Sequence, residues 1–318
     1  MATIGKIAKA ANVSATTISR VFSGQGYVSE RTRQKVLGIA QKLNYLPRVT
    51  SRKDNIAIII ESDTVVRMGA YETSLINAIF QDLITKKYRF EIIPVDEIDL
   101  LLDLFIKGAI CVLYNENSLK KVKQIRRVPL VTINCPVANF HSVYSDHKQG
   151  IELGMTYLAQ RGHRRIGLIL GALDGWGGQE RQKGYWASVE RHGLENDEKL
   201  VHSRLARTLL EAVAGVVKAR PTAIIVGGED IALPVVSALH LLGKRIPEDI
   251  SIISFENTKV SQYLTPMHTT ISQPFAEIGA LGVKTVIDLA EHKACGPVRI
   301  ALPNILIERE SVMKRTGG

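Results

Sequence analysis

The sequence predicts a small all-α head followed by an α/β core of two lobes, and two patterns lead to this prediction. Residues 1–53 carry ten Lys and Arg side chains against one acid, whereas residues 54–318 carry 31 basic and 30 acidic side chains. The head shows apolar residues at helical spacing, while the remainder alternates short β-branched runs with amphipathic stretches, as in parallel sheets covered by helices. The charge partition indicates a module that contacts a polyanion, fused to a near-neutral body of one large or two medium domains.

Three apolar stripes predict three helices in the head. Their members are Ile4, Ile7, Ala8 and Ala11; Ile18, Val21 and Phe22; and Val36, Ile39, Ala40 and Leu43. Asn12 and Val13 leave a tight turn between the first two helices, which is typical of a helix-turn-helix. Ser14 and Ser29 are good N-caps for the second and third helices, because a hydroxyl accepts a hydrogen bond from an otherwise unsatisfied backbone N–H.

The second helix has an outward face that suits the major groove of DNA. With its apolar residues turned inward, this face carries Ala15, Thr16, Ser19 and Arg20. Small and hydrogen-bonding side chains with one guanidinium are what a helix in the major groove needs. Arg20 could donate two hydrogen bonds to O6 and N7 of guanine, or it could bind a phosphate of the DNA backbone. The alternative interpretation of the whole segment is a basic face that is exposed to solvent and does not bind DNA.

Residues 3–47, TIGKIAKAANVSATTISRVFSGQGYVSERTRQKVLGIAQKLNYLP, resemble the DNA-binding domain of the lactose/galactose repressor (LacI/GalR) family of bacterial transcription regulators. The motif runs VS-x-x-T-x-SRV, then VS-x-x-TR-x-x-V, then LNY-x-P. The resemblance implies that Ala15 and Thr16 choose the operator, and that Tyr27 reaches the DNA backbone. It implies phosphate-positioning roles for Thr3, Ser14, Thr17, Ser19 and Thr32. Such phosphate contacts fix register without reading sequence.

The segment after Pro47 departs from the family pattern. Relatives continue through a hinge helix with an A-R-x-L-like signature, whose leucine wedges apart a base step in the minor groove. This chain passes through RVTSRKDN into its first predicted strand, about five residues short, and Val49 is the only aliphatic side chain nearby. We therefore expect weaker DNA kinking, with Arg48, Arg52 and Lys53 contacting phosphates or a narrow minor groove. Whether the shortened hinge, residues 48–55, still forms a minor-groove helix stays open.

The pattern of residues 56–318 predicts two doubly wound parallel sheets. The expected strands are Ile56–Ile60, Phe90–Pro94, Ala109–Leu113, Leu130–Ile133, Ile166–Leu170, Ala223–Val226 and Ile250–Ser254. The expected helices include Tyr71–Lys86, Asp146–Gln160, Gln179–His192, Thr208–Ala219, Asp230–Leu242 and Phe275–His292. Ligands of such folds bind at the carboxyl ends of the strands, and two facing lobes make a cleft that can close.

The family resemblance continues through this core. Its landmarks are SVYSDHKQG, LAQRGHRRIGLILG, ERQKGYWASVERHGL, PTAIIVGGEDIAL, GKRIPEDISIISFEN and LTPMHTTISQP. They resemble the family's sensor core, which is similar to periplasmic sugar-binding proteins. The implied domains are a head at 1–47, a hinge at 48–55 and a core at 56–318. We expect an N-lobe at about 56–134 plus 268–290, a C-lobe at about 135–267 plus 291–318, and the final crossing near His268–Gln273.

The resemblance also assigns candidate effector-binding residues. Arg181 takes the place of the family's effector-binding arginine, where a planar fork suits vicinal hydroxyls or a carboxylate; a surface salt bridge is its alternative role. Glu256 replaces the usual aspartate, and Gly228 with Glu229 replaces Asn-Asp. Tyr71 and Asn134 are expected wall residues. Trp176 and Phe255 could stack on a sugar face, or they could belong to the core.

Other chemistry finds no support in the sequence. Cys111, Cys135 and Cys295 lack metal-ligand spacing, and the eight histidines show no HExxH pattern. His163 is expected to be structural. His147 beside Asp146 suggests a base–acid pair, but Asp146 is well placed to cap the following helix. GALDGWGG fits no nucleotide-binding loop. We therefore expect neither catalysis nor a cofactor or metal.

These observations predict a transcription regulator, most simply a repressor, that binds a palindromic operator as a homodimer. A small effector, expected to be a mono- or oligosaccharide, would close the cleft. The C-terminal half is somewhat similar to the branch that represses cryptic β-galactosidase genes, which implies a galactoside or other oligosaccharide. Corepression and activation stay open. No signal core or long apolar run is present, so we expect a cytoplasmic protein without membrane contact.

Two alternatives come from other classes of protein. The core could be a sugar-metabolising enzyme with a DNA-binding head, although catalytic groups are missing. Alternatively, the shortened hinge could leave an uncoupled, non-specific DNA binder, whose affinity would fall roughly 10³–10⁵-fold between about 50 and 200 mM salt.

Overall fold

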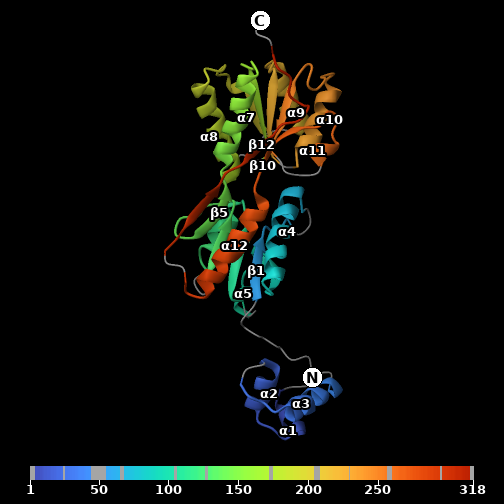
Figure 1. Ribbon diagram of the computed structural model, residues 1–318, viewed down its shortest axis with the longest axis vertical. Coiled ribbons are helices and arrows are strands. Elements are labelled where there is room, and N and C mark those ends of the chain that lie inside the picture. Colours follow the sequence, from blue (N-terminus) through green and yellow to red (C-terminus); the bar gives the residue numbers. More distant parts are fainter. Residues whose placement is uncertain are drawn as a thin grey trace.

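The computed structural model covers the head and both lobes of the core (Figure 1). The residues that it describes are 4–23, 26–43, 55–64, 68–103, 106–125, 128–171, 175–203, 208–228, 230–255, 260–293 and 296–315. The predicted hinge therefore lies outside the described residues, except for Asn55, which begins the first strand.

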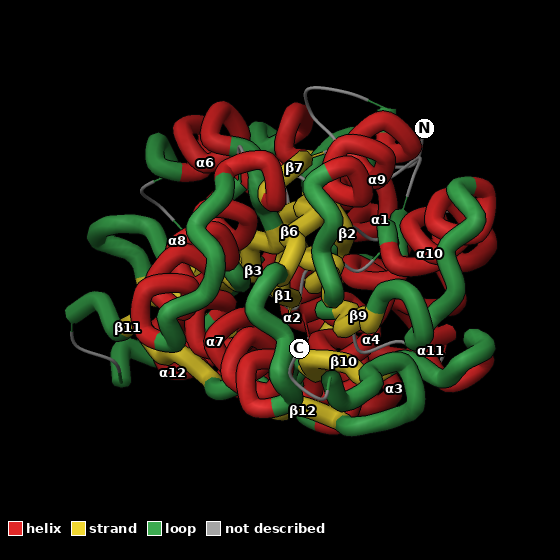
Figure 2. Tube along the Cα trace, turned by 90° about the horizontal axis from the view of Figure 1, so that it is seen from above, coloured by secondary structure: helices red, strands yellow, loops and turns green. Residues whose placement is uncertain are grey.

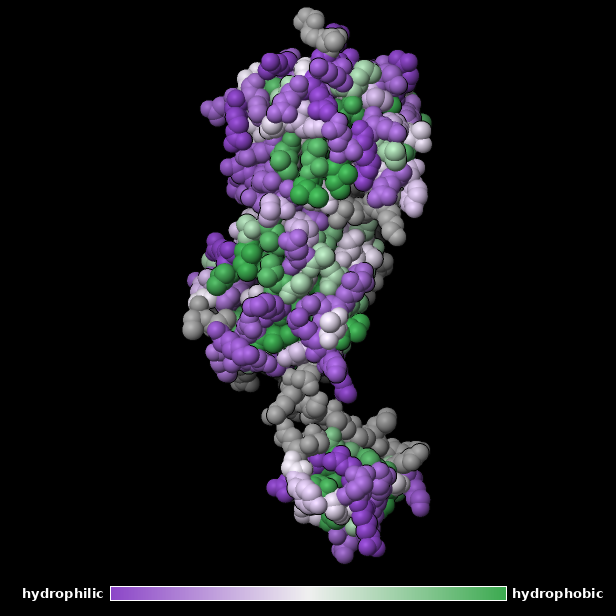
Figure 3. All heavy atoms as spheres, in the orientation of Figure 1, coloured by the Kyte–Doolittle hydropathy of each residue, from purple (hydrophilic) through white to green (hydrophobic). Residues whose placement is uncertain are grey.

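The head contains the three predicted helices, α1 (Ile4–Ala11), α2 (Ala15–Ser23) and α3 (Glu30–Lys42). Their core consists of the buried side chains of Ile7, Ala11, Ile18, Val21, Val36 and Ala40. Two stripe residues lie largely at the surface: Ile4, at the start of α1, is 41% exposed, and Leu43, just after α3, is 42% exposed. Hydrophilic side chains dominate the visible face of the head, whereas apolar side chains gather on both lobes (Figure 3).

The first lobe is built on a six-stranded sheet with the order β11-β5-β4-β3-β1-β2. The strands are β1 (Asn55–Ile60), β2 (Arg89–Pro94), β3 (Gly108–Val112), β4 (Leu130–Ile133), β5 (His141–Ser145) and β11 (Arg299–Leu302). All neighbouring pairs are parallel. Apolar side chains of α4 (Ala70–Thr85) and α12 (Phe275–Ala290) form one buried cluster with this sheet. Those of α5 (Leu100–Asp103) and α6 (Glu116–Val122) form another, beyond the short 3-10 turn η1 (Val95–Glu97).

The second lobe has a similar six-stranded sheet with the order β12-β10-β9-β8-β6-β7, in which β12 pairs antiparallel with β10 and the other pairs are parallel. The strands are β6 (Ile166–Leu170), β7 (Val201–Ser203), β8 (Ala223–Gly227), β9 (Ser251–Ser254), β10 (Thr269–Ser272) and β12 (Ile305–Ile307). The helices are α7 (His147–Gln160), α8 (Trp176–Arg191), α9 (Leu209–Lys218), α10 (Ala232–Leu241) and α11 (Val260–Tyr263), with the 3-10 turn η2 (Glu198–Leu200). Figure 2 shows helices on either side of the strands. Two doubly wound parallel sheets were predicted, and both are present.

The lobe boundaries differ from those expected from the sequence. β5 pairs with β4 in the first sheet, with Val131 opposite His141, so this lobe extends past residue 134 to Ser145. β10 pairs with β9 in the second sheet, and β11 pairs with β5 in the first. The chain therefore crosses between the lobes at three places: after β5, after β10, and between β11 and β12. The strands concerned are short and carry polar residues, which gave no aliphatic run to place them.

The packing of α7 against the second sheet depends on a glycine. A Cβ atom at Gly150 would lie 2.6 Å from Cε2 of Phe255, which is closer than carbon atoms approach in proteins. Phe255 is fully buried directly after β9. The absent side chain at residue 150 therefore lets the start of α7 lie close to the carboxyl end of β9, where the cleft begins.

Candidate functional site

The outward face of α2 has the predicted orientation. Ile18 and Val21 are buried and Phe22 is half-buried, while Ala15, Thr16, Ser19 and Arg20 are exposed. The helix begins at the predicted cap, because the backbone N–H of Thr17 donates to Oγ of Ser14 over 3.0 Å. The four exposed side chains can therefore reach a groove without disturbing the packing of the head.

The predicted phosphate-positioning residues lie around this helix. Ser14 Oγ is 2.9 Å from Thr17 Oγ1, and Ser29 Oγ is 2.8 Å from Thr32 Oγ1. The amide of Thr32 donates to Ser29 Oγ over 3.3 Å, which confirms the second predicted cap. Tyr27 is 92% exposed. Thr3 and Arg48 lie outside the described residues.

The two sheets place their carboxyl ends where a cleft ligand is expected. In both, the order of the first five strands in sequence is 2-1-3-4-5, so the strand order reverses between β1 and β3 and again between β6 and β8. Crevices at such switch points are the usual ligand sites of doubly wound sheets. Glu61 follows β1, Gly228 follows β8, and Asn134 follows β4.

A cluster around Arg181 occupies the second lobe's side of this cleft. Nη1 of Arg181 donates to the carbonyl oxygen of Gly227 over 3.1 Å, and Nη2 lies 3.5 Å from Nδ1 of His147. The guanidinium carbon lies 4.4 Å from the ring centre of Phe255, in cation–π contact. Arg181 is buried rather than a surface ion-pair residue. The structure thus brings three predicted residues together: Arg181, Phe255 and, through His147, Trp176.

His147 is the member of this cluster that sequence reasoning did not select. Its ring centre lies 5.3 Å from that of Trp176 and 5.6 Å from that of Phe255. Burial, and secondarily the charge of Arg181, lowers the pKa of His147 well below its ordinary value, so the imidazole is neutral. Asp146 caps α7 as predicted, accepting from the amide of Gln149 over 3.0 Å. The signal for His147 would have been its place at the start of α7, two residues after the end of β5, a strand that the sequence pattern did not reveal.

A second cluster lies in the first lobe. Nδ2 of Asn134 donates to the hydroxyl oxygen of Tyr71 over 2.7 Å, and lies 3.5 Å from Oε1 of Gln273. Oδ1 of Asn134 accepts from the amide of Ser145 over 2.7 Å. Asn134 adopts φ 50°, a left-handed conformation that asparagine tolerates better than most residues. These contacts hold Tyr71 in place and link it to two of the interlobe crossings.

A hydrogen bond between described residues joins the two lobes across the cleft. The backbone N–H of Ala70, in the first turn of α4, donates to Oδ1 of Asp230 over 2.9 Å. Burial, and to a smaller extent the nearby carboxylate of Asp230, raises the pKa of Glu72 in the same turn. Asp230 therefore acts as an anionic partner for the amino end of α4, where the helix dipole favours negative charge.

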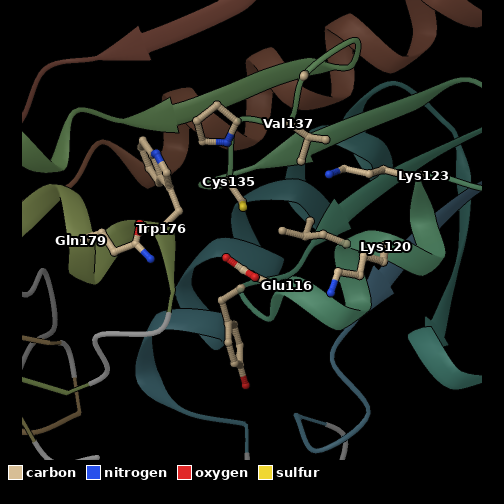
Figure 4. A pocket seen from close by; sticks show the side chains of 11 residues that line it. Glu116, Lys120, Lys123, Cys135, Val137, Trp176 and Gln179 are labelled. Carbon is tan, nitrogen blue, oxygen red and sulfur yellow. The ribbon is translucent and has the colours of Figure 1, made fainter.

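A pocket of about 310 Å³ lies between α6 and the start of α8 (Figure 4). The first lobe contributes Tyr114, Glu116, Leu119, Lys120, Lys123, Cys135, Pro136, Val137 and Ala138, and the second contributes Trp176 and Gln179. Trp176 is the predicted effector residue that lines it. Burial raises the pKa of Cys135 to about 11, so its thiol stays protonated near neutral pH.

Comparison with known proteins agrees with both halves of this geometry. Residues 3–48 match the family described as bacterial regulatory proteins of the lacI family, and residues 155–312 match the periplasmic binding protein-like domain. The chain is similar to LacI-family regulators in its head and to periplasmic binding proteins in its core.

Curated relatives are similar to this chain along its whole length. The probable HTH-type transcriptional repressor ExuR of Bacillus subtilis (strain 168) is 27% identical, covering 99% of this chain and 100% of that protein. The HTH-type transcriptional repressor PurR of Escherichia coli O139:H28 (strain E24377A / ETEC) is 29% identical, covering 98% and 97%. These relatives are transcriptional repressors rather than enzymes, in agreement with the prediction.

Solved structures confirm the fold of the chain. A lac repressor dimer bound to operator and the anti-inducer ONPF has a TM-score of 0.79 at 21% identity, covering 98% of this chain and 99% of that one. The complex of the transcriptional regulator CelR with cellobiose has a TM-score of 0.74 at 23% identity, covering 98% and 100%. Within the described residues, no helix combines the length and apolar character that crossing a membrane requires.

Two features of the site differ from a simple open cleft. Phe255 has no exposed surface, so in this conformation its ring packs against the guanidinium of Arg181 and does not face a ligand. A Cβ atom at Gly228 would lie 3.2 Å from Cγ1 of Ile231, so the wall there is backbone packed against an apolar side chain. Glu229 and Glu256 lie outside the described residues.

Proposed function

We propose that this chain represses transcription by binding a palindromic operator as a homodimer, under the control of a saccharide effector in the interlobe cleft. Effector binding closes the lobes, and their relative rotation changes the spacing of the two heads. A coupling of about 1–3 kcal/mol would change operator affinity about 5- to 150-fold. A galactoside or other oligosaccharide as effector is part of the proposal, and it rests on the resemblance of the C-terminal half to the cryptic β-galactosidase repressors.

The observation that carries the proposal is the exposed face of α2. Its four outward side chains combine direct-readout chemistry with a buried underside and a capped amino end. A solvated basic face would need only Lys and Arg side chains. Ala15, Thr16 and Ser19 add no charge, whereas small and hydroxyl side chains can contact thymine methyl groups and base edges.

The operator is tested by selecting bound sequences from a random duplex library with the full-length protein, at about 150 mM salt. We expect a palindrome whose two half-sites are separated by a whole number of helical turns. Recovery of no motif would favour the uncoupled, non-specific binder instead. The recovered operator then serves as the probe for effectors.

The effector site is tested with Arg181→Met, which keeps much of the apolar volume and removes the guanidinium. We expect this variant to bind the operator, but the effector should change its operator affinity at least about tenfold less. The reason is that the variant lacks the bidentate, charge-assisted hydrogen bonds that a guanidinium donates to hydroxyls or carboxylates. Lys183→Met is the matched control, since Lys183 lies on the same helix and pairs with Glu180 at 2.7 Å on the surface. An unchanged response of Arg181→Met would place the effector elsewhere.

The alternative hypothesis, a sugar-metabolising enzyme, makes a different prediction for the same purified protein. A sugar-metabolising core would convert the saccharide that it binds, whereas an effector is recovered unchanged. Chromatography of the saccharide after prolonged incubation with the protein separates the two outcomes.

A further inference from the structure

The pocket between α6 and α8 has walls from both lobes. From the first lobe come the loops that follow β3 and β4 and the outer face of α6; from the second come Trp176 and Gln179 on the first turn of α8. Any closing or opening of the lobes therefore changes its shape. Its volume of about 310 Å³ lies at the lower end of small-molecule sites, which suits one sugar ring or its substituent rather than a large ligand.

Trp176 connects this pocket to the Arg181 cluster. Its ring centre lies 5.3 Å from that of His147, and Nδ1 of His147 lies 3.5 Å from Nη2 of Arg181. The indole also meets Tyr144 edge-on, with ring centres 5.1 Å apart, which fixes its orientation. Trp176 therefore lines the pocket and also contacts His147 of the Arg181 cluster, so the pocket lies beside that cluster.

The polar groups of the pocket are divided between its two ends. The indole of Trp176 and the amide of Gln179 lie at one end, and the ammonium groups of Lys120 and Lys123 lie at the other, with Glu116 between them (Figure 4). An apolar ring face beside an amide suits a sugar. Two ammonium groups against one carboxylate leave an excess of positive charge, which a neutral sugar would not match.

The two lysines have no competing ion pair in the part of the chain that the structure describes. Nζ of Lys120 lies 3.4 Å from Oδ1 of Asn117, a weak neutral contact. By contrast, Lys121 on the same helix forms an ion pair with Asp96. Helix α6 therefore presents two ammonium groups to the pocket and engages the third with a carboxylate elsewhere.

We propose that this pocket is a lateral subsite of the effector cleft, and that it holds the acid-bearing end of a negatively charged saccharide. The proposal rests on the effector site of the proposed function and names the class of its ligand: a sugar with a carboxylate or phosphate group. The ring lies against Trp176, and the acid group lies between Lys120 and Lys123. Since a carboxylate and a phosphate share this chemistry, the experiment must distinguish them.

The first test compares matched ligands on the full-length protein by isothermal titration calorimetry. The panel is glucose, galactose and mannose, each with its uronic acid and its 6-phosphate. We expect at least one acid to bind about five- to tenfold more tightly than its neutral parent, because two exposed ammonium groups each contribute modestly. This preference should shrink as salt rises, since the lysines are exposed and screened. Preference for the uronic acid or for the 6-phosphate identifies the acid group.

The second test compares two variants of α6. Lys120→Gln/Lys123→Gln should lose most of the preference for the acid while binding the neutral parent and the operator like the wild type. Lys121→Gln, which removes one positive charge from the same helix but outside the pocket, should keep the preference. Equal loss in both variants would mean a general field effect and would overturn the subsite.

Failure of the subsite and failure of the proposed function give different results. If a neutral sugar alters operator binding and no acid binds better than its parent, the regulator stands and the subsite is overturned. If an acid binds through the two lysines but leaves operator affinity unchanged, the subsite stands and the control mechanism is overturned. If no member of the panel binds, the subsite is overturned, and the selected operator alone decides the DNA-binding function.

Discussion

Arg20 is the residue whose two possible roles on DNA give opposite results. Its side chain is exposed at the end of α2, and its Cδ passes 3.3 Å from where a Cβ atom of Gly26 would lie. Gly26, at φ 80°, therefore leaves room for the arginine to extend from the helix. We predict that Arg20→Ala costs about 1–3 kcal/mol of operator binding and relaxes specificity at one base pair, as expected for a fork on guanine. Titration against the selected operator and its single-base variants measures both effects.

The control for Arg20 is an exposed lysine of the same head. Lys35→Ala, on α3, should weaken binding to all sequences alike and reduce the salt dependence by about one phosphate contact. If Arg20→Ala behaves in this uniform way, Arg20 is a phosphate clamp and base readout belongs to its neighbours on α2.

His268, just before β10, predicts a pH dependence of the core's stability. The ring is fully buried, with Nδ1 2.8 Å from Oγ of Ser254, and Arg309 donates to the backbone carbonyl oxygen of His268. Burial, and secondarily Arg309, lowers the pKa of His268 to about 4. The unfolded chain therefore binds this proton more readily than the folded one, and stability falls as pH drops from about 6.5 towards 4, by about 3 kcal/mol at most.

Urea unfolding followed by tryptophan fluorescence at pH 7.0 and 5.0 tests this expectation. Both tryptophans, Trp176 and Trp186, lie in the core, so the signal reports on that part alone. His268→Asn should flatten the decline between the two pH values, while His240→Asn, at an exposed position on α10, should not. A decline of equal steepness in both variants would assign the effect to other buried histidines, such as His147 and His163, whose pKa values burial also lowers.

At the scale of elements, the amino end of α4 is an interlobe contact that a single charge can weaken. Asp230 accepts from the amide of Ala70 over 2.9 Å and stabilises the end of the helix dipole. We predict that Asp230→Asn shifts the lobes towards a more open arrangement by about 0.3–1 kcal/mol. It should also lower the pKa of Glu72, since the like charge of Asp230 contributes to raising it. Small-angle scattering of the ligand-free protein would show a larger radius of gyration.

Asp288→Asn provides the control for this contact. Asp288 forms a surface ion pair with Lys284 on α12, so the substitution removes the same charge at a position away from the cleft. A radius unchanged by Asp230→Asn, or changed equally by Asp288→Asn, would mean that the interlobe hydrogen bond does not influence opening.

The elements also show how far local sequence patterns determine this fold. Ser14, Ser29 and Asp146 cap their helices as predicted, because a cap depends only on neighbours within three residues. The long aliphatic strands were predicted for the same local reason. β5 and β10 were missed or assigned to the wrong lobe, since HSVYS and TTIS contain polar residues and offer no aliphatic run. The same limit applies to the candidate site. Arg181 was predicted from its motif, whereas the position of His147 in the site depends on where β5 ends.

At the scale of the whole molecule, the three crossings set how the lobes can move. The first and third are tied together at Asn304, which is 3% exposed between β11 and β12. Its Nδ2 donates to the carbonyl oxygen of Asp146 over 2.6 Å, and its Oδ1 accepts from Oγ of Ser145 over 2.7 Å. The first and third crossings are thus joined side by side, while Asn134 links the first to Gln273 at the second. A rotation of one lobe must bend all three together.

Asn304→Ala is therefore predicted to affect both stability and signalling. It leaves buried groups at Ser145 and Asp146 without partners, which costs about 1–3 kcal/mol of core unfolding free energy, measured by urea denaturation with tryptophan fluorescence. Because the crossings then bend independently, effector should still bind but change operator affinity less. Asn117→Ala, at an exposed position on α6, is the control and should alter neither quantity. Full coupling in Asn304→Ala despite the lost stability would show that the joined crossings support the fold without transmitting the signal, and that transmission follows another route between the lobes.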